Sequence, residues 1–151
     1  SDAVQVLKYD YDVLVLSGEV DLELLGRPLA IWADWARNLA SGVEHDLAYG
    51  VGAFLGRAAA ARSWEAGVLY QSMDKDAMFA QLVDSDFAAG RTDGDGWLFR
   101  VGYAPVSNVV LNATWMLNRL YKDVAPVAGP GYSVGSGLDY QRLQLDVNYR
   151  F

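Results

Sequence analysis

The stretch LDYQRLQLDVNYRF, residues 138–151, alternates between two kinds of side chain. Its apolar members are Leu143, Leu145, Val147, Tyr149 and Phe151, and a polar or charged residue separates each from the next. Successive side chains of a β-strand point to opposite faces, whereas a helix would scatter this pattern around its surface. The stretch therefore predicts a strand with one apolar and one polar face.

The same period of two recurs in six further segments. They lie within residues 11–26, 27–38, 45–57, 63–71, 96–104 and 108–119. Most approach the ~9–11 residues with which a tilted strand crosses a bilayer. Small residues such as Gly50 and Gly52 oppose large ones, which predicts a crowded face. Residues 3–9 form a weaker candidate for an eighth strand.

Composition narrows the function classes. The chain has 151 residues, of which 52% are hydrophobic and 21% charged, with a net charge of −7 and no cysteine. The acidic balance argues against a nucleic-acid partner and against docking on an anionic lipid surface. No apolar run reaches the roughly 18–20 residues of a transmembrane helix. We expect no cofactor.

The connections between the predicted strands differ in length. Those at residues 25–28 and 105–108 are short, whereas those following residues 71 and 119 are long. Short turns on one rim and long loops on the other are typical of an outer-membrane barrel. The sequence thus predicts an all-β fold, an antiparallel transmembrane β-barrel of about 8 strands, or the C-terminal part of a larger porin barrel. Residues 1–151 would form one such domain or the C-terminal portion of one.

A soluble β-barrel or sandwich explains the alternation equally well. Aromatic residues at the ends of the apolar faces favour the membrane, where they form belts at the two interfaces. The belt candidates are Trp35, Trp64, Tyr70, Trp97, Tyr103, Tyr149 and Phe151.

Two resemblances extend this interpretation. The last strand, with Leu143, Leu145, Val147, Tyr149 and Phe151, resembles the C-terminal assembly signal of bacterial outer-membrane proteins. Residues 75–117 and 16–38 resemble the bacterial putative porin family. The matching residues are Asn38, Asp84, Asp86, Phe87, Gly90, Gly102, Tyr103, Leu111, Asn112, Ala113 and Thr114.

The resemblance implies an outer-membrane channel for passive diffusion of small hydrophilic solutes and no enzyme activity. Its partners would be outer-membrane lipids, the barrel-assembly machinery, and upstream barrel strands or other subunits. The alternatives are a small closed barrel with a structural or binding role, and a soluble ligand-binding barrel.

Polar side chains of the predicted strands are the candidates for lining a lumen. They are Glu19, Asp21, Glu23, Asp34, Glu65, Arg100, Asn112, Thr114, Arg142, Asp146, Asn148 and Arg150. Such a face either fills a narrow barrel with ion pairs or selects solutes in a wider one.

Other chemistry has weaker support. Asp84, Asp86, Asp93 and Asp95 could offer oxygen ligands to Ca²⁺, but no Glu closes an EF-hand loop, so we expect no metal site. His45, beside Ser41 and Asp46, lacks a nucleophile elbow. Residues 78–87 have near-helical apolar spacing, which predicts a short helix in that loop.

Overall fold

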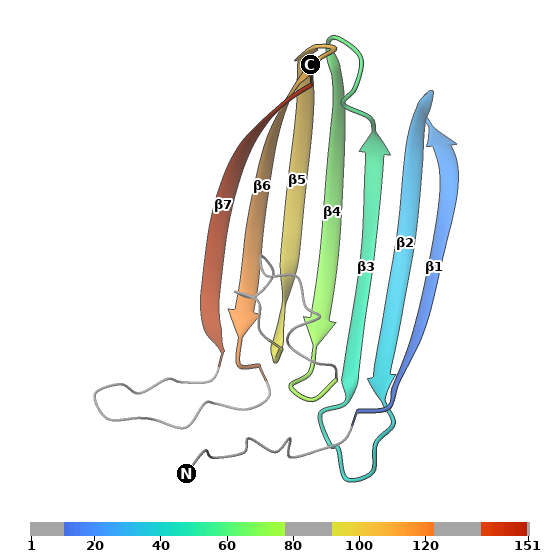
Figure 1. The fold of residues 1–151 in the computed structure, drawn as a ribbon, viewed down its shortest axis with the longest axis vertical. Coiled ribbons are helices and arrows are strands. Elements are labelled where there is room, and N and C mark those ends of the chain that lie inside the picture. Colours follow the sequence, from blue (N-terminus) through green and yellow to red (C-terminus); the bar gives the residue numbers. More distant parts are fainter. Residues whose placement is uncertain (1–10, 78–91, 123–136, 151) are drawn as a thin grey trace, which may run out of the picture.

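The computed structural model describes residues 11–77, 92–122 and 137–150, which form one antiparallel sheet of seven strands in chain order (Figure 1). The strands are β1 (Val13–Leu24), β2 (Arg27–Asn38), β3 (Leu47–Gly56), β4 (Ser63–Met73), β5 (Gly94–Val106), β6 (Val109–Leu120) and β7 (Leu138–Tyr149). None of the described residues forms a helix that could span a membrane. The prediction of seven antiparallel strands is confirmed. The candidate strand at residues 3–9 and the candidate helix at residues 78–87 lie outside the described residues.

Each strand pairs with its neighbours in the chain, so successive connections lie on opposite rims. Residues 39–46, 74–93 and 121–137 connect strands at one rim, here called the loop rim. Residues 25–26, 57–62 and 107–108 connect them at the other, the turn rim. The tight β1–β2 turn places Leu25 at φ 53° and Gly26 at φ 71°, as a two-residue type I′ hairpin requires.

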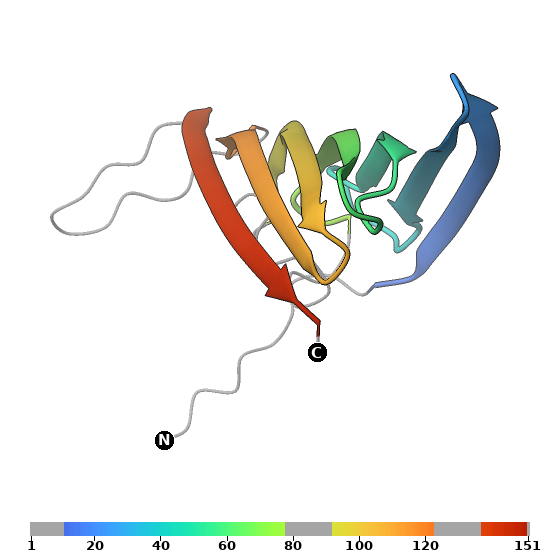
Figure 2. The same ribbon diagram turned by 90° about the horizontal axis from the view of Figure 1, so that it is seen from above.

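The sheet is twisted and open. Figure 2 shows β1 and β7 as its two edges, and each pairs with one neighbour only among the described strands. The described strands therefore form a curved wall and do not close on themselves as a complete barrel does. Closure requires strands that pair with the outer edges of β1 and β7.

The two faces of the wall differ in burial. Side chains at buried positions, such as Ala48, Met73, Asn112 and Met116, lie on the face that also carries Glu65, here called the polar face. The opposite, apolar face carries exposed large residues on every described strand except β4, whose residues on this face are half-buried. Its large exposed members include Leu16, Val20, Leu22, Ile31, Tyr49, Val51, Trp97, Phe99, Val101, Tyr103, Leu111, Trp115, Leu143, Leu145, Val147 and Tyr149.

This distribution is the reverse of a soluble β-sandwich, which buries its apolar face. On β7, Leu143, Leu145 and Val147 are 65%, 72% and 70% exposed. The neighbouring Arg142, Gln144 and Asp146 lie on the polar face and are half-buried.

Candidate functional site

The register of the seven strands collects the predicted lumen residues on one face. In one transverse row, Glu65 lies beside Gly102, which lies beside Asn112, which lies beside Asp146. In the next row, Arg100 lies beside Thr114. The same parity places Glu19, Asp21, Glu23, Asp34, Arg142 and Asn148 on this polar face. Arg150 follows β7, and its backbone N–H donates to the Asn108 carbonyl oxygen at 2.9 Å.

Charge on the polar face is unevenly distributed. Glu19, Asp21 and Glu23 follow one another along β1, and Asp34 on β2 lies directly opposite Ser17. All four carboxylates are exposed. Among the described residues no basic side chain forms an ion pair with any of them, so the β1–β2 side of the wall is acidic.

The basic side chains of the polar face lie on strands distant from β1 and β2, Arg100 on β5 and Arg142 on β7. On β5, Arg100 Nη2 lies 3.4 Å from Glu65 Oε1 and 3.4 Å from Asn112 Oδ1. The Glu65 carboxylate also accepts the Ala58 N–H at 3.1 Å, which ties the 57–62 turn to the wall. On β7, the Gln144 amide donates to the Asp146 carboxylate at 3.1 Å. Arg100, Glu65 and Asn112 thus form a partly exposed network that links β4, β5 and β6.

Glycines on β3 and β4 accommodate aromatic rings on the same face. A Cβ placed on Gly52 would lie 2.7 Å from Cε2 of the Trp32 ring, and one on Gly50 would lie 3.5 Å from Cζ3. A Cβ on Gly67 would overlap the Phe54 ring. The rings therefore occupy the space that a Cβ atom would need at Gly52 and Gly67, so only glycine fits there. This confirms the crowding predicted from the small residues of β3.

An apolar patch crosses the middle of the polar face. Leu69 of β4 pairs with Leu98 of β5, which pairs with Met116 of β6. These three side chains, with Trp32 and Phe54, were not among the predicted lumen residues, because that prediction was drawn from polar residue types alone. The strand register, which sequence alternation leaves open between neighbours, brings them into one row.

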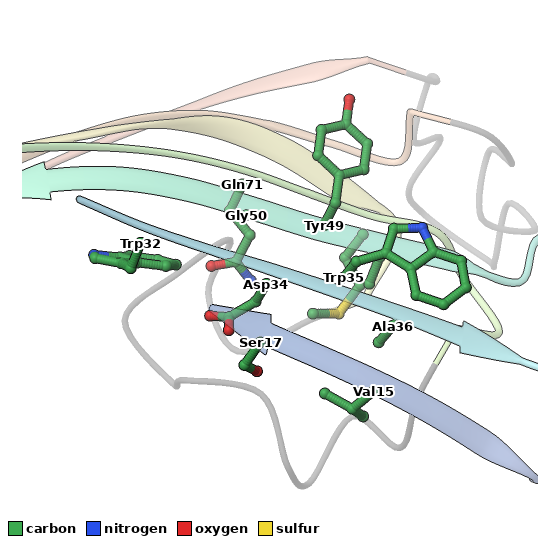
Figure 3. Close-up of a pocket in the computed structure, with 11 residues that line it drawn as sticks. Val15, Ser17, Trp32, Asp34, Trp35, Ala36, Tyr49, Gly50 and Gln71 are labelled. Atoms are coloured by element: carbon green, nitrogen blue, oxygen red, sulfur yellow. The ribbon is translucent and has the colours of Figure 1, made fainter. Parts of the chain in front are cut away.

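A cavity of about 320 Å³ lies on the polar face near the loop rim. Its lining includes Ser17, Trp32, Asp34, Gly50 and Gln71 from four consecutive strands. Figure 3 shows Asp34 and Ser17 on one side of the sheet, with Tyr49 pointing to the other.

The loop rim is held by ion pairs. Arg119 Nε lies 3.0 Å from Asp95 Oδ1, and the Tyr70 hydroxyl donates to Asp95 at 3.1 Å. Lys122 Nζ lies 2.6 Å from Asp74 Oδ1, and the Asp74 carboxylate also accepts the Leu47 N–H at 3.0 Å.

The β1–β2 part of this rim is fixed by Asn38. Its amide donates to the Asp76 carbonyl oxygen at 2.9 Å, and its side-chain oxygen accepts the N–H of Asp12 at 3.1 Å. Tyr11 lies at the same rim. Its pKa is raised above the ordinary value, mainly because the hydroxyl is partly buried and also because the Asp76 carboxylate carries a negative charge nearby.

The geometry supports neither the Ca²⁺ site nor the catalytic role of His45 considered from the sequence. The Asp95 carboxylate is occupied by Arg119 and Tyr70, and Asp93 is buried, while Asp84 and Asp86 lie outside the described residues. Within the described ranges no three His, Cys, Asp or Glu side chains gather as metal ligands would. Near His45, the Asp46 carboxylate accepts from Arg37 Nε at 2.8 Å and so is held by an ion pair.

Aromatic side chains of the apolar face form two groups. Near the loop rim, Tyr70 contacts Tyr49 and Trp97 with ring centroids 6.2 Å and 5.0 Å apart. Near the turn rim, Trp64 pairs with Tyr103, and the Arg27 guanidinium lies 4.5 Å from the Trp64 ring centroid. Trp64 and Tyr70 are separated along β4 by about 20 Å at ~3.3 Å per residue. That distance fits the two edges of an apolar band about 25 Å tall.

The aromatic residues of the apolar face are not confined to the two predicted belts. Phe99 and Trp115 lie one step nearer the middle of the apolar face, with ring centroids 6.3 Å apart. Trp35 pairs with Tyr49 near the loop rim and Tyr149 with Val109 near the turn rim, as the belts require. Phe151 lies outside the described residues.

Comparison with known proteins agrees with the two-faced wall. A family model described as putative porin matches residues 6–151. The chain belongs to this porin family. No curated protein and no solved structure gave a significant match.

Family membership confirms the resemblance seen in residues 16–38 and 75–117. It also accounts for the reversed burial, because a porin strand faces lipid on one side and the barrel interior on the other. The porin-like part of the chain includes all seven described strands.

Proposed function

We propose that this porin-family chain forms wall strands of a bacterial outer-membrane channel through which small hydrophilic solutes diffuse passively. The apolar face contacts lipid, and the polar face lines the water-filled interior. The chain acts as a channel wall and not as an enzyme. Its partners are outer-membrane lipids, the barrel-assembly machinery, and the strands or subunits that pair with the edges of β1 and β7.

One observation carries this proposal: the apolar face carries exposed large side chains on six of the seven described strands, all but β4, while charged residues occupy the other face. Burying a large apolar side chain is worth about 1.5–3 kcal/mol. If Leu143, Leu145 and Val147 stayed in water, β7 alone would lose the stabilisation from burying three apolar side chains. A hydrocarbon surround recovers it, and monomeric soluble proteins rarely leave so large an apolar surface uncovered.

Single-channel recording tests the proposal. The intact protein, purified from membranes and inserted in a planar bilayer in KCl, should give stepwise openings, and proteoliposomes carrying it should swell in small sugars. A protein that inserts but passes neither ions nor sugars would contradict the channel function.

The second candidate is a closed barrel without a pore, with a structural or binding role. It is favoured by the Leu69–Leu98–Met116 row and by the Trp32 and Phe54 rings, which occupy volume on the polar face. Small barrels fill their interior with side chains in this way. The same recording separates the two candidates, because a filled barrel inserts without conducting.

A further inference from the structure

The cavity beside Trp32 has features of a binding surface. Next to it lies a second hollow of about 480 Å³, lined by Ser17, Gly18, Glu19, Trp32 and Asp34. Ser17, Trp32 and Asp34 border both spaces. The first, at about 320 Å³, has the size of a small-molecule site, and such sites combine an apolar surface with a few polar groups.

The Trp32 ring lies flat against the wall. A Cβ on Gly52 would meet its Cε2, Cζ2 and Nε1 atoms at 2.7, 2.8 and 2.9 Å, and one on Gly50 would meet Cζ3 at 3.5 Å. These atoms belong to both rings of the indole, so the side chain runs along the β3 backbone with one face against the two glycines. Trp32 is only half-buried. Its second face is therefore directed away from the two glycines, and Figure 3 shows the ring edge-on.

Two carboxylates lie beside this ring. Glu19 lies directly opposite Trp32 on β1, and Asp34 lies two residues along β2 on the same face. Two basic groups on the described strands and rim nearby are already paired: Arg100 of β5 with Glu65, and Lys122 at the loop rim with Asp74. A cation that approaches the indole thus meets negative charge that the described part of the wall leaves uncompensated, whereas an anion is repelled.

We propose that the Trp32 cavity is a subsite for small organic cations, of the ammonium or guanidinium class, that pass through this channel. The cationic group lies on the open indole face, the tryptophan ring being the best aromatic partner for a cation. Asp34 and Glu19 supply the counter-charge, and Gln71 and Ser17 offer hydrogen bonds to polar parts of the solute. This inference rests on the proposed function and names its preferred solute class.

The site binds weakly, as conduction demands. Both carboxylates are exposed, so water screens their attraction, and the exposed indole face adds a modest contribution. A subsite that attracts a solute and still releases it raises the local solute concentration without blocking the pore.

Current block by arginine amide, which carries a guanidinium and an ammonium group, tests the inference. In planar bilayers with the intact protein, we expect block at concentrations about tenfold below those at which galactose or glutamate acts. Asp34→Asn and Trp32→Ala should each raise the half-blocking concentration about fivefold, which corresponds to about 1 kcal/mol. Asp139→Asn and Trp115→Phe, both on the apolar face, serve as matched controls and should change nothing.

Three outcomes are decisive. Block unchanged by both Asp34→Asn and Trp32→Ala, or stronger for glutamate than for arginine amide, would overturn the subsite. If Trp32→Ala fails to assemble, Asp34→Asn and Glu19→Gln decide, since neither exposed carboxylate holds the fold. If the protein opens no pore, the channel proposal fails; titration calorimetry of the detergent-solubilised protein with arginine amide then tests the subsite independently, and lost binding in Asp34→Asn supports it.

Discussion

At the scale of single residues, glycine positions decide how tightly the wall packs. Gly67 and Gly52 carry no positive φ, so their role is not conformational. Each leaves room for a ring from the neighbouring strand, Phe54 over Gly67 and Trp32 over Gly52. The rings thereby bury part of their surface against backbone and fix one strand against the next.

Gly67→Ala should therefore destabilise the protein. The added methyl would overlap Phe54, and forcing extra volume into a packed site costs about 1–3 kcal/mol. The measurement is the urea midpoint of the folded band on unheated gels of the purified protein.

Gly18→Ala is the matched control. Gly18 also lies within a strand, but a methyl group added there would meet no heavy atom within 4 Å. We expect its midpoint to stay near that of the parent protein. Equal midpoints for both variants would show that ring contact with Gly67 has no energetic weight.

At the scale of the strand, much of the wall could be predicted. Period-two alternation locates all seven strands, because side chains of residues such as Leu143 and Gln144 must point to opposite faces. A short connection could be predicted within residues 25–28, and the structure narrows it to the two-residue turn at Leu25–Gly26.

The relation between strands was harder to predict. The ion pair of Arg119 with Asp95 and the row of Leu69, Leu98 and Met116 depend on register, which one strand's own pattern does not determine. The curvature of the sheet and the pairing of its edges likewise depend on neighbours. The cavity at Trp32 needed the position of the ring over Gly52, for which the only signal was the run of small residues on β3.

The faces of β7 give a test at this scale. Leu145→Arg places a charge on the proposed lipid face, where it costs about 2–4 kcal/mol at the bilayer midplane. We expect a marked fall in the folded, membrane-inserted fraction, measured by heat-modifiable mobility. Gln144→Arg, on the polar face of the same strand, should insert normally. Equal insertion of the two variants would count against a lipid-facing apolar surface.

The end of the same strand carries the assembly prediction. Deleting Phe151 should slow insertion in cells far more than it lowers the stability of protein already folded, because one aromatic residue contributes only about 1.5–3 kcal/mol of burial. Pulse-chase measurement of insertion, beside urea unfolding of the purified variant, separates the two effects. A deletion that inserts at the parent rate would refute the assembly role.

At the scale of the whole molecule, the two rims differ in the way that orients a barrel. The turn rim has the two-residue connections at Leu25–Gly26 and Ser107–Asn108, whereas the loop rim joins its strands through longer segments, including residues 39–46. In outer-membrane barrels short turns lie in the periplasm and longer loops outside the cell. The rim ion pairs, such as Arg37 with Asp46 at 2.8 Å, also suit a surface exposed to water and lipid head groups.

Cysteine labelling tests this orientation directly, since the chain has no cysteine of its own. Ser41 and Ser107 are both exposed, one at each rim, so the pair of variants Ser41→Cys and Ser107→Cys is matched in residue type and accessibility. A maleimide carried on a polyethylene glycol too large to pass a porin should modify Ser41→Cys in intact cells, because that segment faces outward. It should reach Ser107→Cys only after the outer membrane is permeabilised, and the parent protein provides the background. Modification of Ser107→Cys from outside intact cells, with Ser41→Cys protected, would invert the topology and with it the assignment of the loop rim to the cell surface.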